Sequence, residues 1–140
     1  MAEKQVLLVE DEPNIAEAIR FILSRAGWAV AIEGNGAAAL GRIAAMRPRA
    51  VILDLMLPGR SGLEILADLR ADRDLAATPV LMLTARGQGR DREAVERAGA
   101  TAFLAKPFAN ADVLAALEAI AAPLAGGGAV PTAAAVARGA

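Results

Sequence analysis

Short apolar runs alternate with longer stretches of helical spacing along the chain. The apolar runs cover residues 6–9, 28–32, 50–55, 79–84 and 101–105. Several of them are unbroken rows of Val, Ile and Leu, with no alternation of apolar and polar positions. Such rows are typical of strands in a parallel sheet whose two faces are both covered by helices. The pattern therefore predicts five buried parallel strands.

The stretches between and after these runs predict five helices. They are an Ile/Leu stripe after Pro13 (Ile15, Ile19, Ile22 and Leu23), an alanine-rich stretch over residues 37–46, a leucine stripe (Leu63, Leu66 and Leu69), a charged stretch over residues 91–98, and residues 110–122. Gly27, Pro48 and Gly99 stand where the first, second and fourth of these helices are expected to end. Five strand–helix units of this size predict a doubly wound α/β domain with right-handed crossovers.

The composition is that of a globular domain followed by a short tail. Hydrophobic residues make up 56% of the chain and charged residues 22%, which is typical of a protein with a buried core. From Pro123 onward the sequence is rich in Ala, Gly and Pro, as in flexible linkers. We expect one domain over residues 1–122 and a flexible tail or linker stub over residues 123–140.

Charge and residue usage argue against several classes of function. The 15 basic and 16 acidic residues nearly cancel, so the bulk positive charge typical of nucleic-acid binders is absent. The chain has neither Cys nor His, which excludes disulfides and thiolate metal sites and removes the usual general base. No signal-peptide pattern is present, and no apolar run approaches the ~20 residues that span a bilayer. We expect a cytoplasmic protein without direct membrane or nucleic-acid contacts.

Polar side chains stand at the ends of four of the predicted strands. Glu10 and Asp11 stand at the end of the first strand, Asp54 of the third, Thr84 of the fourth and Lys106 of the fifth. Open α/β sheets bind ligands at the carboxyl ends of their strands, near the point where the strand order reverses. If the first and third strands are neighbours, three carboxylates converge there.

Converging carboxylates repel one another unless a cation joins them, and all-oxygen ligation suits Mg²⁺. Lys106 adds a compact positive charge and Thr84 adds a hydroxyl donor, both suited to phosphoryl oxygens. An Asp can act as a nucleophile and form an aspartyl phosphate. The pattern therefore predicts phosphoryl transfer to a carboxylate oxygen.

Each of these residues also has a simpler interpretation. The acids at residues 10–12 would be favourable near the N-terminus of the next helix whether or not they bind a metal. Asp54 precedes Leu-Pro-Gly and fits a turn, Thr84 fits an ordinary strand end, and Lys106 fits a solvated loop. The functional hypothesis depends on finding all of them at successive strand ends. Glu12 is assigned to helix capping and not to the metal site.

In this order and at these spacings, the sequence resembles the receiver domain of two-component response regulators over residues 4–122. The motifs that carry the resemblance lie at residues 9–12, 53–59, 83–85, 99–100 and 103–108. The resemblance implies a flavodoxin-like (βα)5 fold with strand order 2-1-3-4-5. It also implies a phosphorylation-activated signalling switch, which performs phosphotransfer and dephosphorylation only on itself.

The resemblance assigns a role to each matching residue. Asp54 is implied as the phosphoacceptor. Asp11 is implied to bind Mg²⁺ directly, Glu10 through a bound water, and Met56 through its backbone carbonyl, with Asp54 completing the set.

Four residues at the fourth and fifth strands also receive roles from the resemblance. Thr84 and Lys106 are implied to hold the phosphoryl oxygens. Phe103 is implied as an aromatic switch that turns inward when Thr84 moves, although a plain core aromatic explains the same residue. The peptide bond before Pro107 is implied to be cis.

The resemblance also implies partners. The phosphodonor is a sensor histidine kinase or a histidine phosphotransfer protein, and the output protein is unknown. The expected state is a monomer or a phosphorylation-dependent homodimer. The segment 111–124 has no basic residue, which disfavours a salt-bridged dimer and favours an apolar contact with a partner. The chain is expected to be a stand-alone receiver or the receiver fragment of a longer regulator.

Three other functions compete with the switch. A phosphatase of the haloacid dehalogenase type needs a second Asp two residues after the nucleophile, where this chain has Met56. Flavin or nucleotide binding is disfavoured because the chain lacks a G-x-x-x-x-G-K-[ST] loop and a Gly-rich turn after the first strand. A degenerate scaffold is disfavoured by the full acid, Thr and Lys set.

Overall fold

The structure is a computed structural model that describes residues 4–84, 89–106 and 108–121. Its strands are β1 (Gln5–Val9), β2 (Ala29–Glu33), β3 (Ala50–Asp54), β4 (Val80–Thr84) and β5 (Ala102–Ala105). Its helices are α1 (Pro13–Arg25), α2 (Gly36–Met46), α3 (Gly62–Ala71), α4 (Gly89–Ala98) and α5 (Asn110–Ala121). All strands pair in parallel in the order β2-β1-β3-β4-β5. The flavodoxin-like prediction is confirmed.

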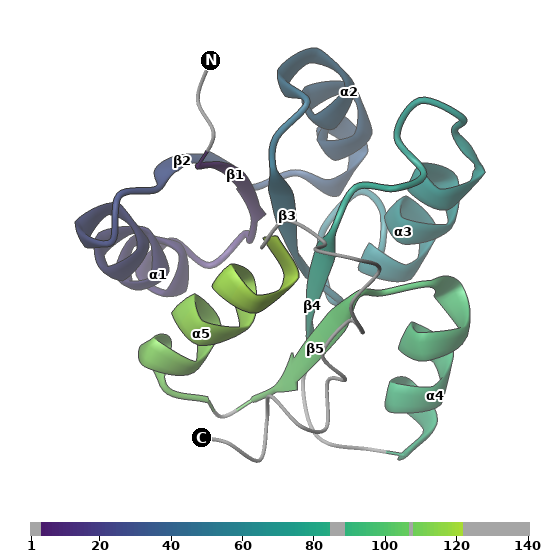
Figure 1. Cartoon of the computed structure of the whole chain (residues 1–140). Coiled ribbons are helices and arrows are strands. Elements are labelled where there is room, and N and C mark those ends of the chain that lie inside the picture. Colours follow the sequence, from purple (N-terminus) through teal and green to yellow (C-terminus); the bar gives the residue numbers. More distant parts are fainter. Residues whose placement is uncertain (1–3, 85–88, 107, 122–140) are drawn as a thin grey trace, which may run out of the picture.

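Helices cover both faces of the sheet. Figure 1 shows α1 and α5 together on one side and α2, α3 and α4 along the other. Alternate residues of β1 enter different halves of the core: Val6 and Leu8 pack with α1 and α5, whereas Leu7 and Val9 pack with α2 and α3. This two-sided burial explains why the strands read as unbroken apolar rows.

The helix ends lie close to the residues that the sequence indicated. Pro13 occupies the first turn of α1, and Gly27 and Gly99 follow α1 and α4 with φ angles of 98° and 100°. The C-cap residue of α2, Arg47, is left-handed with φ 48°, and Pro48 follows it. Trp28, predicted to begin a strand, instead donates its backbone N–H to the carbonyl of Leu23 at the end of α1.

Glu12 is the N-cap residue of α1 by position, but its side chain forms no capping hydrogen bond. Its backbone N–H instead donates to a carboxylate oxygen of Glu10, at 3.1 Å. The prediction that Glu12 caps the helix is therefore right about the position and wrong about the side chain. The acid that meets the backbone here is Glu10.

The apolar character of α5 serves the core. Its buried residues are Val113, Ala116, Leu117, Ile120 and Ala121. The exposed positions of α5 are small or polar, with Ala111, Ala115 and Glu118 facing solvent. Among the described residues, the large hydrophobic side chains that are exposed are Phe21 and Met56. The large apolar side chains of the described part of α5 thus pack against the sheet, and the expected apolar contact of the segment 111–124 with a partner stays a prediction.

The loop that joins β3 to α3 lies against the first turn of α2. The backbone N–H of Gly36 donates to the carbonyl of Pro58 at 3.0 Å. A Cβ atom at Gly36 would overlap the carbonyl oxygen of Arg60, and one at Gly62 would overlap that of Asp54. These close backbone approaches require glycine. They fix the path of the chain directly after Asp54.

No helix in the described part of the chain has the combined length and apolarity that crossing a lipid bilayer requires.

Replacing Gly36 by Ala is expected to lower the free energy of unfolding by about 1–3 kcal/mol, because the added methyl group forces the loop and α2 apart. Gly41, in the interior of the same helix, is the matched control because a Cβ atom there meets nothing within 4 Å. Gly41→Ala should raise the free energy of unfolding by about 0.5–1 kcal/mol. Urea unfolding of both variants measures the difference, and equal effects would contradict the close approach.

Candidate functional site

Three carboxylates meet at the carboxyl ends of β1 and β3. Val9 of β1 pairs with Leu53 of β3, so the residues that follow them, Glu10 and Asp54, lie side by side. Together with Asp11, each offers one carboxylate oxygen, and these three oxygens all lie within 4.8 Å of one another. Glu10 and Asp54 are only 2% and 3% exposed, whereas Asp11 faces solvent. The sheet order thus brings the three acids together and leaves one side of the cluster open.

Both oxygens of Asp54 have a donor. Oδ1 accepts the backbone N–H of Met56 at 3.1 Å, and Oδ2 lies 3.3 Å from the Nζ atom of Lys106. Lys106 follows β5 and reaches Asp54 across the end of β4, which separates the two strands in the sheet. A buried carboxylate needs such partners because desolvation disfavours its charge. The two donors fix the orientation of the Asp54 side chain.

Glu10 is less well satisfied than Asp54. Its Oε2 accepts the backbone N–H of Glu12, but Oε1 is buried without a hydrogen-bond partner among the described residues. Burial, followed by the proximity of Asp54, raises the pKa of Glu10 from 4.5 to about 7. The carboxyl group of Glu10 is therefore a weaker acid than usual, and one of its oxygens has no hydrogen-bond partner among the described residues. A cation or a proton would relieve its repulsion with Asp54.

The donor set fits a hard divalent cation. It consists of carboxylate oxygens, which such ions prefer, and it includes the unpartnered Oε1 of Glu10. Asp11 stands at the solvent side of the cluster, where an ion that keeps several of its waters can be held. The acidic cluster is therefore a candidate metal site.

Thr84 and Phe103 occupy the two strands beyond Asp54. Thr84 ends β4, is 1% exposed, and donates its hydroxyl to the backbone carbonyl of Leu104 at 3.4 Å. Phe103 lies in β5 beside Met82 of β4 and is buried in the half of the core that faces α2, α3 and α4. The roles predicted for these two residues stay predictions.

Two of the predicted features lie wholly or partly outside the described residues. Pro107, expected to follow a cis peptide bond, is one of them, and residues 123–140, expected to form a tail, are another. Met56, by contrast, is described: its N–H contacts Asp54 and the residue is 68% exposed. Its predicted carbonyl ligation of a metal stays a prediction.

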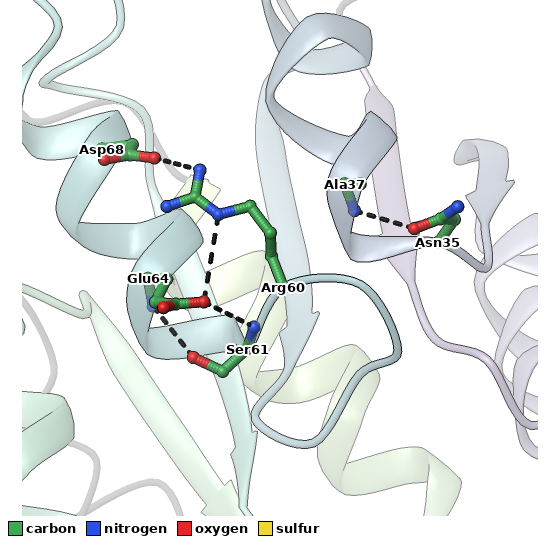
Figure 2. A network of polar contacts seen from close by, with 6 residues as sticks. All are labelled: Asn35, Ala37, Arg60, Ser61, Glu64 and Asp68. Carbon is green, nitrogen blue, oxygen red and sulfur yellow. Dashed lines mark hydrogen bonds and ion pairs between the residues drawn. The ribbon is translucent and has the colours of Figure 1, made fainter.

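Sequence reasoning missed the residues that hold the loop after Asp54. Figure 2 shows two of the anchors: Ser61 and Glu64 at the start of α3, and Asn35 at the start of α2. Ser61 and Glu64 form a reciprocal capping box, and the side chain of Asn35 accepts the backbone N–H of Ala37 at 2.8 Å. A Ser followed three residues later by Glu is a known signature of a helix start and was available in the sequence.

An apolar groove of about 340 Å³ opens beside the site, between α1 and the chain that follows β5. Its lining residues are Asn14, Ile15, Ala18, Lys106, Phe108 and Asn110. Since Lys106 contacts both the groove and Asp54, a molecule lying in the groove would be next to the acidic cluster.

Comparison with known proteins finds one family over most of the chain. Residues 6–118 match the family described as the response regulator receiver domain. The probable transcriptional regulatory protein TcrX of Mycobacterium tuberculosis is 39% identical over 115 residues, which are 82% of this chain and 48% of that protein. The chain therefore spans about half the length of the curated relatives that it matches.

Solved structures agree with this result. A putative response regulator from Chloroflexus aurantiacus has a TM-score of 0.82 at 33% identity, covering 86% of this chain and 98% of that one. The receiver domain of a sensor histidine kinase from Pseudomonas aeruginosa has a TM-score of 0.78 at 30% identity, covering 84% and 97%. That structure has a magnesium ion coordinated in its active-site cleft.

A divalent cation is expected to raise the unfolding temperature more above pH 7 than below it. Between 4.5 and about 7, the folded protein without metal keeps a proton on Glu10 that the unfolded chain has lost. The contribution of Glu10 to stability therefore falls as the pH rises through this range. An ion requires the ionised carboxylate, so at lower pH it must displace that proton. Thermal unfolding with MgCl₂ and with EDTA on both sides of pH 7 tests this expectation.

Glu10→Gln is the control for that experiment, because it keeps the size of the side chain and removes its charge. At pH values above 7 and with EDTA present, Glu10→Gln should have a higher unfolding temperature than the unaltered protein. The stabilisation by the cation should also depend less on pH in this variant. An equal cation effect on both sides of pH 7 in the unaltered protein would contradict the assignment.

Proposed function

This chain belongs to the response regulator receiver domain family, whose members are phosphorylation-activated switches of two-component signalling, and we propose that Asp54 is its phosphoacceptor. The observation that carries the proposal is the environment of Asp54. It is the member of the acidic cluster whose two oxygens are oriented, by Met56 and by Lys106. An oriented carboxylate beside a positive charge is suited to attack a phosphoryl group.

In the proposed reaction an oxygen of Asp54 attacks the phosphorus atom of the donor. A new P–O bond forms while the bond from phosphorus to the leaving group breaks, and that group departs with the electron pair. With a phosphohistidine donor, the ring nitrogen is the leaving atom and the imidazole can then take up a proton from water. The chain itself needs to supply no general acid, which agrees with its lack of His.

The charged residues around Asp54 divide the remaining work. Lys106, at 3.3 Å, offsets negative charge on the phosphoryl oxygens. Glu10 and Asp11 would hold Mg²⁺, together with Asp54 and the backbone carbonyl of Met56. When bound, the ion supplies positive charge that offsets repulsion between these carboxylates and the incoming phosphoryl group.

The signal is proposed to pass through Thr84 and Phe103. The Thr84 hydroxyl now donates to the Leu104 carbonyl, and a phosphoryl group on neighbouring Asp54 offers it a stronger, charged acceptor. Moving Thr84 toward that acceptor would change the space available to Phe103 on β5, and with it the surface around α4 and β5. Such a pull biases two pre-existing arrangements of the domain.

The proposed phosphodonor is a sensor histidine kinase or a histidine phosphotransfer protein, acting in the cytoplasm, where ATP is available. Phosphotransfer and dephosphorylation are proposed to be self-catalysed. The output protein stays unidentified, and the near-neutral charge favours no direct nucleic-acid contact by this domain. A monomer or a phosphorylation-dependent homodimer is proposed, with residues 1–122 as the receiver and 123–140 as a tail.

A phosphatase of the haloacid dehalogenase type is not supported. Its general acid would stand two residues after Asp54, and Met56 there offers an exposed thioether that cannot donate a proton.

Replacing Asp54 by Asn is expected to abolish phosphorylation, because the amide is not a nucleophile. Intact-protein mass spectrometry after treatment with Mg²⁺ and a small phosphodonor should show a single phosphoryl increment on the unaltered protein and none on Asp54→Asn. Asp11→Asn serves as a second variant that keeps the nucleophile but weakens metal binding, and should slow the reaction without removing the site. A full-yield increment on Asp54→Asn would overturn the assignment.

Replacing Lys106 by Ala is expected to slow phosphorylation by the same donor by at least roughly tenfold, since one cationic donor is lost beside the developing charge. The fold should persist, because the Lys106 side chain is partly exposed. Lys4→Ala, at the other lysine of the sequence, is the control because Lys4 contacts Ala26, Trp28 and Glu118 and not the site. Equal rates for the two variants would remove Lys106 from the mechanism.

A further inference from the structure

Arg60 connects the end of the loop after Asp54 to the outer face of α3. Its Nη1 atom donates to Oδ2 of Asp68, and its Nε atom lies 3.9 Å from Oε1 of Glu64 (Figure 2). The three residues are spaced four apart, so the two acids stand one turn apart on the same side of the helix, each within reach of Arg60. The planar guanidinium can bridge two carboxylates, which a lysine cannot do in the same geometry.

The carboxylate of Glu64 is shared between this contact and the helix start. Its Oε1 also accepts the backbone N–H of Ser61 at 3.2 Å, while the Ser61 hydroxyl accepts the backbone N–H of Glu64. Arg60 therefore fixes the same Glu64 rotamer that closes the capping box. The last two residues of the loop are held to α3 through one network, drawn in Figure 2.

The opposite side of the loop is held by α2. Pro58 accepts the N–H of Gly36, and Gly59 adopts φ 86° with no room for a side chain beside Asn35. The loop is thus anchored at its middle and at its end. At its start, the Leu55–Met56 peptide is held on both sides: the Met56 N–H donates to Asp54, and the Leu55 carbonyl accepts the N–H of Gly62, the first residue of α3, at 2.9 Å.

We propose that Arg60 is a positioning residue for Asp54: by tying the loop to Glu64 and Asp68, it keeps the Met56 N–H directed at Oδ1 of the phosphoacceptor. The inference rests on the proposed function of Asp54 and adds a residue to it. Without the contacts of Arg60, the loop regains conformations in which the Met56 N–H no longer donates to Asp54. The conformational entropy lost when the loop is ordered again then adds to the free-energy barrier of the reaction. The Arg60 side chain points along α3, so it acts through the loop and not on the phosphoryl group.

The ion pairs of Arg60 are partly exposed, with side-chain exposures of 38% for Arg60 and 40% and 60% for its partners. Such pairs are weakened by salt and contribute modestly. The expected effect of losing them is therefore roughly a two- to fivefold drop in the phosphorylation rate.

Arg60→Ala, Arg60→Lys and Asp68→Asn test the inference, with Arg20→Ala as the matched control. Arg20 pairs with Glu17 at 2.9 Å on α1 and has no contact with the loop. The readouts are the hydrogen-exchange rate of the Met56 amide by NMR and the phosphorylation rate with a small phosphodonor at saturating Mg²⁺. Arg60→Ala should raise the exchange rate of the Met56 amide and lower the phosphorylation rate by similar factors. Arg60→Lys should restore part of both rates, and Arg20→Ala should leave both rates unchanged.

Salt provides a test without substitution. Raising the ionic strength should lower the rate of the unaltered protein toward that of Arg60→Ala and leave the variant less affected. An unchanged Met56 exchange rate in Arg60→Ala would overturn the inference. Equal phosphorylation rates of Arg60→Ala and the unaltered protein would also overturn it, provided that Asp54→Asn abolishes the reaction. Failure of the unaltered protein to accept a phosphoryl group would instead overturn the proposed function, and the Met56 exchange rate would still decide whether Arg60 positions the loop.

Discussion

Two carboxylates buried at the ends of adjacent strands are the constraint around which the rest of the site is arranged. The order β2-β1-β3-β4-β5 places Glu10 beside Asp54, and burial removes most of the water that would screen their repulsion. An apolar pair in this position would stabilise the fold more simply. Keeping two acids here makes sense if their mutual repulsion is relieved by a ligand.

Partners for these acids come from parts of the chain that are distant in sequence. Lys106 reaches Asp54 from the end of β5, and the Met56 amide reaches it from a loop that α2 and α3 both hold. The geometry around Asp54 is therefore a property of the whole carboxyl edge of the sheet. Packing that looks purely structural, such as the contact of Gly36 with the loop, helps to set the orientation of the Asp54 carboxylate.

Strand and helix positions followed from the sequence because helices on both faces make the strands uniformly apolar and Pro and Gly mark the helix ends. The convergence of the acids followed from strand order. Contacts that depend on side-chain direction did not follow. Apolar residues on α5 look alike whether they face the sheet or a partner, and Glu12 resembles a capping acid although Glu10 receives the backbone N–H. In the sequence, Arg60 stands four residues before Glu64, a spacing typical of an ordinary surface ion pair. The structure adds that Arg60 lies at the end of the loop that begins beside Asp54.

The cluster has three acidic side chains and, among the described residues, one lysine that contacts it. Adding a phosphoryl group to Asp54 increases the negative charge, and a bound cation decreases it. If the proposed function holds, phosphorylation of Asp54 and binding of the cation therefore favour each other. This linkage is reciprocal: a cation that stabilises phosphorylated Asp54 by a given factor binds the phosphorylated form more tightly by the same factor. The unpartnered oxygen of Glu10 contributes to this coupling, because a cation that binds it also offsets the negative charge of Asp54 and of the phosphoryl group. Metal binding is in that case part of the switch itself, since it changes how readily the phosphorylated state is reached.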